Sequence, residues 1–291
     1  MPAIVDPVIE WFAGHARDLP WRRPGTSPWA VLVSEVMLQQ TPVSRVLPAY
    51  RAWLERWPLP ADLAADQPGE AVRMWDRLGY PRRALRLHAC ATAIAAEHGG
   101  RVPDELPALL ALPGVGAYTA RAVLAFAYGR RAAVVDVNVR RVLARAVDGQ
   151  GQPGPPAIAR DLAAMERLLP SDDATAARFC AATMELGALV CTAGQPACTR
   201  CPLRERCAWR LAGCPPYTGP TVRPQRFAGT DRQVRGLLMA VLRAAPGPVP
   251  QASLDLAWPD PLQRQRAQDS LVADGLIDPL PDGRFALPSR G

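Results

Sequence analysis

Lysine is absent from this sequence of 291 residues, although basic residues are common. All 34 basic residues are therefore arginines, which stay charged, bind phosphate through a planar fork of donors and cannot act as amine nucleophiles. This absence excludes any mechanism that needs a lysine Schiff base. A codon bias toward Arg, Ala and Pro would explain the absence, and the chemical consequence is the same.

Histidine and long apolar segments are also scarce. His15, His88 and His98 are scattered along the chain, which excludes a histidine metal site and a nucleophile activated by histidine. No apolar run has the length of a signal peptide, and none approaches the roughly 18 residues that span a membrane. We therefore expect a cytoplasmic protein, associated with the nucleoid if it is bacterial, with no membrane partner.

The charge balance indicates a polyanionic partner. The 34 basic residues exceed the 27 acidic ones, and the formal net charge is +7. Such a balance fits nucleic acid better than an acidic metabolite.

Apolar residues recur at helical spacing through most of the chain, as in Val139, Val142 and Leu143, and this pattern predicts an all-α fold. Clusters of proline and glycine at 20–28, 149–156 and 215–224 predict loops, of which only the third is interpreted as a domain boundary. Beyond it we expect a winged-helix-like module of three short helices, one of them at PVPQASLDLAW (248–258), closed by a small hairpin. Its use would be either a second DNA contact or a structural cap.

Four of the seven cysteines crowd into the segment CTAGQPACTRCPLRERC. Cys191, Cys198, Cys201 and Cys207 have the spacing C-x6-C-x2-C-x5-C, which can wrap one compact cluster. The spacing favours a [4Fe-4S] cluster. Structural zinc sites usually pair two short C-x2-4-C arms, so zinc is the second alternative and a site with no metal the third. The other cysteines, expected to be ordinary thiols, are Cys90, Cys180 and Cys214.

The stretch LPGVGAYTARA (112–122) places two glycines before a helix predicted to begin near Ala117. Gly114 and Gly116 allow positive φ and, with Val115, would leave backbone N–H groups bare for an anionic oxygen. Together with the short helix predicted at DELPALLAL (104–112), this forms a helix-hairpin-helix.

Further along, VVDVNVRR places Asp136 and Asn138 at the predicted start of another helix. An aspartate in this position is as often an N-cap as a catalyst.

Six motifs, in this order, resemble those of the helix-hairpin-helix DNA glycosylases. They are LVSEVMLQQT (32–41), RLGYPRRALRLH (77–88), ALPGVGAYTARAV (111–123), VVDVNVRRVLAR (134–145), MELGALVC (184–191) and the four-cysteine segment. Within that superfamily, SEVMLQQT is most similar to the adenine DNA glycosylases of the MutY type, and the resemblance covers roughly residues 6–215. It implies an iron-sulfur helical domain made of residues 1–20 and 130–215 and a six-helix barrel at 21–129. A linker at 216–229 and the module at 230–291 would follow.

The resemblance implies a monofunctional enzyme that flips a base out of the duplex and hydrolyses the glycosidic bond of adenine mispaired with 8-oxoguanine or guanine. Glu35 matches the general acid, Asp136 matches the carboxylate that stabilises the cationic sugar, and Asn138 would orient them. Tyr118 stands where related lyases have a catalytic lysine, so we expect base removal without strand cleavage. Pro2 would offer a secondary amine if it became the first residue, although nothing places it near Asp136.

The resemblance also implies contacts with DNA. Gln40 and Tyr80 match residues that enter the duplex beside the flipped base. Trp21, Arg22 and Glu185 match positions that line the adenine pocket. Core packing is the alternative for Tyr80, and structural roles are the alternative for Trp21 and Glu185. The residues expected at DNA or at a base are Trp21, Arg22, Gln40, Thr41, Tyr80, Gly114, Val115, Gly116 and Glu185.

Three features depart from the adenine-specific pattern. Val137 stands where these enzymes usually have glycine, and Pro81 where they usually have a second tyrosine. Because His98 is the last histidine, the Phe-Ser-His loop that reads 8-oxoguanine in the family is not expected. The alternatives are a mismatch thymine or uracil DNA glycosylase and a non-catalytic iron-sulfur DNA-binding protein, although a binding module has no use for Glu35 as a proton donor. We expect a monomer that binds double-stranded DNA carrying a mispair or an oxidised base.

Overall fold

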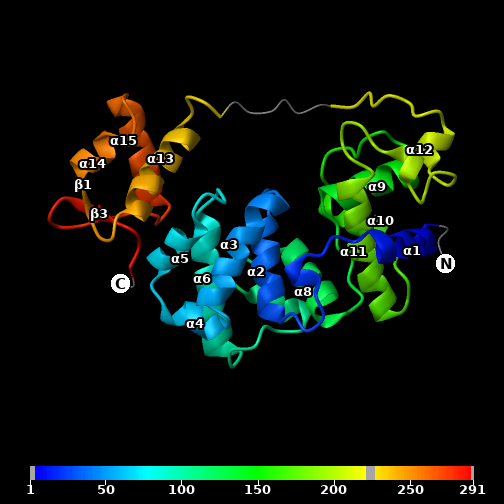
Figure 1. Ribbon diagram of the computed structural model, residues 1–291, viewed down its shortest axis with the longest axis horizontal. Coiled ribbons are helices and arrows are strands. Elements are labelled where there is room, and N and C mark those ends of the chain that lie inside the picture. The colour runs from blue at the N-terminus through cyan, green and yellow to red at the C-terminus, as the bar shows by residue number, and fades with distance from the viewer. Residues whose placement is uncertain (1–3, 221–226, 290–291) are drawn as a thin grey trace. The chain divides into compact units, whose positions relative to one another are not determined.

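The computed structural model describes residues 4–220 and 227–289, and these ranges are mainly helical (Figure 1). They contain fifteen α-helices, two short 3-10 helices and three short strands, which confirms the predicted all-α class. Pro2 and part of the predicted linker lie outside the described residues. No helix within the described ranges is both long and apolar enough to cross a membrane.

The chain divides into two compact units, and the predicted domain boundaries remain a prediction. The first unit comprises Met1–Val31, Asp104–Leu110 and Gly116–Val222, and the second comprises Leu32–Pro103, Ala111–Val115 and Arg223–Gly291. Two helices, α2 (Pro28–Leu38) and α7 (Leu106–Ala111), contribute residues to both units.

The first unit is built around the pair α9 and α11, with α1, α8, α10 and α12 packed against them. The interior positions of α9 fall on one face, where Val139, Val142 and Leu143 are buried, as the helical spacing predicts. The helices and 3-10 turns of this unit are α1 (Val5–His15), η1 (Pro20–Arg22), α8 (Ala117–Tyr128), α9 (Val137–Ala146), α10 (Ile158–Glu166), α11 (Asp173–Leu189), η2 (Cys198–Arg200) and α12 (Ala208–Leu211).

The second unit packs α6 against α4 and α5, and α5 against α3. Its core contains three fully or almost fully buried tryptophans in edge-to-face contact, with ring centroids 4.7 Å apart for Trp53 and Trp57 and 5.6 Å apart for Trp53 and Trp75. Such pairs add to the stabilisation that burial of the rings provides. The helices are α3 (Val43–Arg56), α4 (Pro60–Ala65), α5 (Pro68–Trp75) and α6 (Arg82–Glu97).

The C-terminal segment belongs to this second unit and has the expected helices and hairpin. Three helices, α13 (Asp231–Ala244), α14 (Gln251–Asp255) and α15 (Pro261–Ala273), accompany a small antiparallel sheet of order β1-β3-β2. The strands are β1 (Val249–Pro250), β2 (Asp278–Pro279) and β3 (Arg284–Ala286).

One prediction about this segment was wrong. Residues 248–258 do not form a single helix, because Pro250 ends a strand and only Gln251–Asp255 are helical. Val249 and Pro250 pair instead with Phe285 and Arg284 of β3, so the helix begins only after these two residues.

Candidate active site

Asp136 is both the N-cap of α9 and a carboxylate held in one orientation. Its Oδ1 accepts hydrogen bonds from the backbone N–H groups of Asn138, at 2.9 Å, and Val139, at 2.7 Å. Its Oδ2 accepts a hydrogen bond from the side-chain amide of Asn138, also at 2.7 Å. The structure therefore brings Asp136 and Asn138 together as the sequence predicted, and the capping role fixes the carboxylate in place.

The protonation of Asp136 reflects two opposing effects. Burial raises the pKa of its carboxyl, and the three hydrogen bonds and the charge of Arg141 oppose that rise without cancelling it. A half-buried carboxylate that ionises at this position attracts a nearby cation more strongly than it would in bulk water.

Arg141 links the Asp136 site to the four-cysteine segment, and sequence reasoning missed it. Its guanidinium donates to Asn138 Oδ1 at 2.7 Å, to the carbonyl of Gly187 at 2.6 Å and to the carbonyl of Cys191 at 2.6 Å. The one available signal was its position three residues after Asn138 on a predicted helix, where the two side chains share a face.

Gly187 allows this close packing of α11 on α9. A Cβ atom at this position would lie 2.7 Å from Asn138 Cβ and 2.8 Å from Asn138 O, both closer than real contacts allow. The helix start that carries Asp136 is therefore seated directly on a glycine of the neighbouring helix.

The four predicted ligand cysteines surround one small cavity of about 20 Å³ together with Arg145 and Trp209. Burial, followed by the negative charges of Cys191, Cys207 and Cys198, raises the pKa of the Cys201 thiol to about 11. Four thiolates gathered in this way repel one another unless a positively charged group neutralises them. The donor set therefore fits a thiolate-bound cluster.

Arg145 holds the cysteine segment against α9. This buried guanidinium lies 3.4 Å from Cys191 Sγ and donates to the carbonyls of Gly151, at 2.8 Å, and Thr192, at 2.7 Å. Within the described ranges, no group of three or more His, Cys, Asp or Glu side chains is placed to hold a single metal ion. A cluster of several irons is larger than one ion and accepts ligands that lie farther apart.

Outside this segment, Cys90 and Cys180 are buried thiols, as expected, and burial raises the pKa of each to about 12. Cys214 is exposed.

Glu185 is fully buried and paired with arginines of the first unit. Arg17 donates to it from its backbone N–H and from two side-chain nitrogens, at 2.6–3.0 Å, and Arg22 Nη1 lies 3.0 Å from its Oε2. Burial alone would raise the pKa of Glu185, but these hydrogen bonds and charges outweigh burial and lower it. Of the predicted adenine-pocket residues, the structure thus joins Glu185 to Arg22, and Trp21 is buried in the same unit.

Tyr118 lies in the first turn of α8, where the sequence placed it, and is half-buried. It belongs to the same unit as Asp136. A phenol at this position can donate or accept a hydrogen bond but cannot form an imine.

In the second unit, Glu35 is a buried carboxyl on α2, 5% exposed. Near it along the chain lie Val36, the fully buried apolar Val33 and Met37, and the fully buried Ser34. Its role as an acid stays a prediction.

Gln40 and Tyr80 are exposed, with φ of 54° and 50°, a left-handed conformation that is uncommon for residues other than glycine. Thr41, the residue after Gln40, is buried, and its hydroxyl donates to the carbonyl of Leu78, two residues before Tyr80, at 3.1 Å. Two loops distant in sequence are thus joined, each presenting one of the predicted wedge residues.

The glycine turn differs in part from its prediction. Gly114 adopts a φ of 77°, and a Cβ there would lie 2.7 Å from Arg86 Cβ, so glycine is required on both counts. Gly116 caps α8 in an extended conformation with φ −91° and does not use positive φ. The N–H of Val115 donates to the carbonyl of Leu112 at 3.1 Å, so the turn itself uses this group, which was expected to be bare.

Two of the three departures from the adenine-specific pattern lie at helix starts. Val137 is the first residue of α9 and is 67% exposed, and Pro81 is the N-cap residue of α6. Val137 is not among the residues with positive φ, so its backbone does not require glycine.

Comparison with known proteins places this geometry in a family. Residues 33–167 match the HhH-GPD superfamily base excision DNA repair proteins. The chain is 55% identical to the adenine DNA glycosylase of Mycobacterium tuberculosis over 98% of its own length and 93% of that protein. It is 39% identical to the adenine DNA glycosylase of Homo sapiens over 70% of its length and 38% of the human protein.

A solved structure supports the fold independently. A thermostable thymine-DNA glycosylase aligns with a TM-score of 0.63 at 28% sequence identity, over 72% of this chain and 95% of that one. The similarity includes a protein of different base specificity, so fold alone does not identify the base.

Proposed function

The chain belongs to the HhH-GPD superfamily of base excision DNA repair proteins and, within it, to the adenine DNA glycosylases, and from this premise we propose that it removes adenine mispaired with 8-oxoguanine or guanine. Its substrate would be double-stranded DNA, bound by a monomer, with the adenine flipped out of the helix. We also propose a cytoplasmic location, with the protein associated with the nucleoid if it is bacterial.

The observation that carries this proposal is the fixed carboxylate of Asp136. Loss of the base leaves positive charge on the sugar, and a preoriented carboxylate stabilises that charge without having to reorganise. Asn138 holds Asp136 Oδ2 from the side, and two backbone N–H groups hold Oδ1.

Glu35 supplies the proton in this proposal. The proton passes from the Glu35 carboxyl to a ring nitrogen of adenine, and the glycosidic bond breaks with its electron pair leaving on the base. Water then adds to the sugar carbon and its proton passes to the Glu35 carboxylate, which restores the acid, so the products are free adenine and an abasic site. Glu35 is buried on α2.

Strand cleavage through an imine does not belong to this reaction. The chain contains no lysine. By its resemblance to the family, Tyr118 matches the position at which the related lyases carry one. The DNA backbone therefore stays intact after the base leaves.

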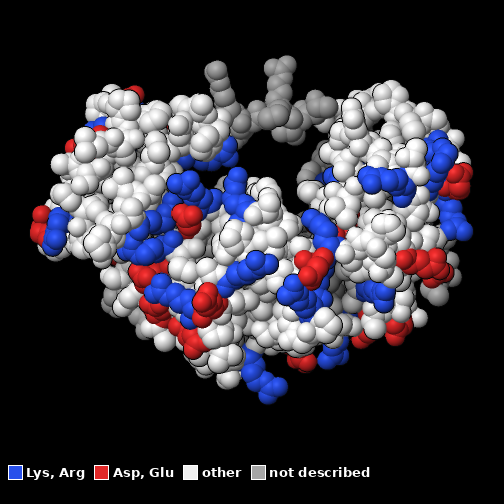
Figure 2. All heavy atoms as spheres, viewed as in Figure 1, with Lys and Arg blue, Asp and Glu red and all other residues white. Residues whose placement is uncertain are grey.

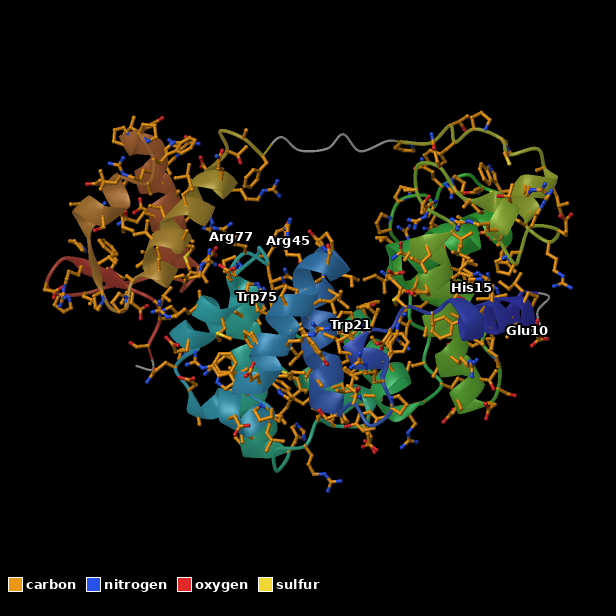
Figure 3. All side chains as sticks on the ribbon, viewed as in Figure 1. Glu10, His15, Trp21, Arg45, Trp75 and Arg77 are labelled. Carbon is orange, nitrogen blue, oxygen red and sulfur yellow. The ribbon has the colours of Figure 1, made fainter. Side chains whose placement is uncertain are left out.

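Contacts with DNA would come from Gln40 and Tyr80 as unstacking wedges and from arginines beside them. Arg45, near the start of α3, and Arg77, in the loop after α5, are exposed, and Figure 3 shows both side chains extending away from the helices. Guanidinium groups in such positions bind phosphates.

We assign the four-cysteine segment to a [4Fe-4S] cluster held by Cys191, Cys198, Cys201 and Cys207. When bound, the cluster would supply a rigid thiolate-linked core that fixes the segment on α9. This chain's own contribution is the pair Arg141 and Arg145, which tie that segment to the helix that begins at Asp136. A purified protein that contains iron and sulfide and absorbs broadly near 400 nm would support the assignment, and zinc as the sole metal would overturn it.

Single-turnover reactions on labelled duplexes test the proposed function. One set of duplexes carries adenine opposite 8-oxoguanine, guanine or cytosine. A second set carries thymine or uracil opposite guanine. Each duplex is analysed with and without alkali. We expect breaks in the adenine strand opposite 8-oxoguanine or guanine, and only after alkali. Release of thymine or uracil in place of adenine would overturn the base assignment, and breaks without alkali would overturn the monofunctional mechanism.

A further inference from the structure

Arg83, in the first turn of α6, is a buried guanidinium, and its hydrogen-bond partners among the described residues are carbonyls and one hydroxyl. Its Nη1 donates to the carbonyls of Val36, Met37 and Gln39, at 2.7–3.1 Å. Its Nη2 donates to Thr41 Oγ1 at 3.0 Å and to the carbonyls of Leu78 and Gly79, at 3.3 and 3.0 Å.

These partners fall into two groups that are distant in sequence. One nitrogen binds the end of α2 and the residue before Gln40, whereas the other binds the residue after Gln40 and the two residues before Tyr80. The guanidinium also lies over the Tyr80 ring, with 5.8 Å between Cζ and the ring centroid, and over the buried Trp75 at 5.1 Å. Arg83 thus touches both loops from the protein interior, while Gln40 and Tyr80 face solvent.

Both exposed residues are held in an unfavourable conformation. Gln40 and Tyr80 have positive φ, and such residues persist only where the surroundings determine the backbone. Four of the six hydrogen bonds of Arg83 go to groups within two residues of Gln40 or Tyr80, and the other two go to carbonyls at the end of α2. Burial lowers the pKa of Arg83 to about 10, so the guanidinium remains charged at neutral pH and keeps all its donors.

We infer that Arg83 is a positioning residue for base flipping: it locks the loops of Gln40 and Tyr80 into one rigid wedge before DNA binds. This inference rests on the proposed function, because a wedge has a use only if a base is flipped. Arginine is required because its planar fork reaches both loops at once, whereas a lysine ammonium would reach one of them. The binding of phosphates by exposed arginines would be largely independent of Arg83.

The experiment separates unstacking from binding and from folding. A 2-aminopurine placed beside the target adenine, opposite 8-oxoguanine, reports unstacking by stopped-flow fluorescence at saturating enzyme, and anisotropy reports affinity. For Arg83→Gln we expect unstacking about 10- to 100-fold slower, because a small misplacement of a positioned group costs that much. The affinity should change by less than about threefold, since phosphate contacts dominate it. The unstacking rate of Arg83→Lys should lie between that of Arg83→Gln and that of the wild type.

Two further variants keep the inference falsifiable if Arg83→Gln folds poorly. Thr41→Val removes the hydroxyl that joins the loops while keeping the shape of the side chain, and it should also slow unstacking. Arg73→Gln is the matched control, because Arg73 donates to the carbonyls of Leu242, Arg243 and Ala245 at the end of α13 and to neither loop. It should lower thermal stability without slowing unstacking.

The outcomes distinguish the inference from the function on which it rests. If the wild-type protein unstacks and releases adenine while Arg83→Gln and Thr41→Val do so at the same rate, the inference is wrong and the function stands. If Arg73→Gln slows unstacking as much as Arg83→Gln does, the effect is general destabilisation and the inference is also wrong. A wild-type protein that neither unstacks nor releases adenine overturns the proposed function itself.

Discussion

At the scale of single residues, Asp136 shows how a structural role and a chemical role can share one side chain. Capping α9 requires a carboxylate whose oxygens face the first N–H groups of the helix, and stabilising a cation requires a carboxylate that does not move. The same three hydrogen bonds meet both needs. The sequence could not separate the two interpretations because they are compatible.

Arg141 tunes this carboxylate and provides a test by pH. Its positive charge favours the ionised form of Asp136 and so lowers the pKa of the carboxyl, opposing the effect of burial. In Arg141→Gln that pKa rises further, and at a given acidic pH a smaller fraction of Asp136 is ionised. We predict that the acid limb of the single-turnover rate moves to higher pH, and that the loss of rate grows as the pH falls.

The control for this prediction is the neighbouring arginine of the same helix. Arg140 pairs with Asp161 at 2.7 Å, so Arg140→Gln should leave the acid limb in place. An unmoved limb in Arg141→Gln, or an equal shift in both variants, would show that Arg141 does not set the protonation of Asp136.

At the scale of elements, the contact of α9 with α11 positions the catalytic helix start. We predict that Gly187→Ala lowers the single-turnover rate by about 10- to 100-fold, because the added methyl group displaces Asn138. Overpacking of this kind should also reduce the free energy of unfolding by about 1–3 kcal/mol. Single-turnover kinetics and denaturant unfolding measure the two effects.

Gly14 in α1 gives a matched control, because a Cβ at that position meets nothing within 4 Å. Gly14→Ala should keep the wild-type rate and raise stability by up to about 1 kcal/mol. A Gly187→Ala protein with the wild-type rate would mean that the start of α9 tolerates displacement and that its placement is not critical.

Local chemistry explains which elements could be predicted from the sequence. The starts of α8 at Ala117 and of α9 after Asp136 follow from a glycine or aspartate placed directly before an apolar periodic segment. The prediction of one helix over 248–258 was wrong because Val249 and Pro250 pair with β3. The partner strand lies more than thirty residues further along the chain, so the local pattern does not reveal this pairing.

The contacts that hold the site together could not be predicted in this way. Arg141 meets the carbonyl of Gly187 across 46 residues of sequence, and Arg83 meets the carbonyl of Gln39 across 44. Nothing in the local pattern distinguishes these arginines from the many that are solvated. Only tertiary packing shows which arginines are buried and which carbonyls they bind.

At the scale of the whole molecule, the basic character of the chain rests entirely on arginine. Figure 2 shows arginine side chains interspersed with acidic ones over the visible face. Many arginines bind acidic partners within the protein, as Arg82 and Arg235 bind Asp274. Phosphate binding therefore depends on the exposed arginines that do not serve such pairs.

Arg45 and Arg77 provide the test of this view. Each contact with a phosphate releases counterions, so Arg45→Gln and Arg77→Gln should each reduce the slope of log affinity against log salt by about 0.9. Arg284→Gln is the control with the same change of charge, since Arg284 is exposed and paired with Asp282 at 2.7 Å. Fluorescence anisotropy across a salt series measures the slopes, and equal slopes in all three variants would refute the assignment.

The central claim is that Glu35 donates the proton on which release of adenine depends. The most direct measurement is the single-turnover release of free adenine, detected by chromatography, from a duplex carrying adenine opposite 8-oxoguanine, by the wild-type protein and by Glu35→Gln. We predict that Glu35→Gln binds the duplex within about threefold of the wild type and releases adenine at least about 100-fold more slowly. Release at the wild-type rate would contradict the account.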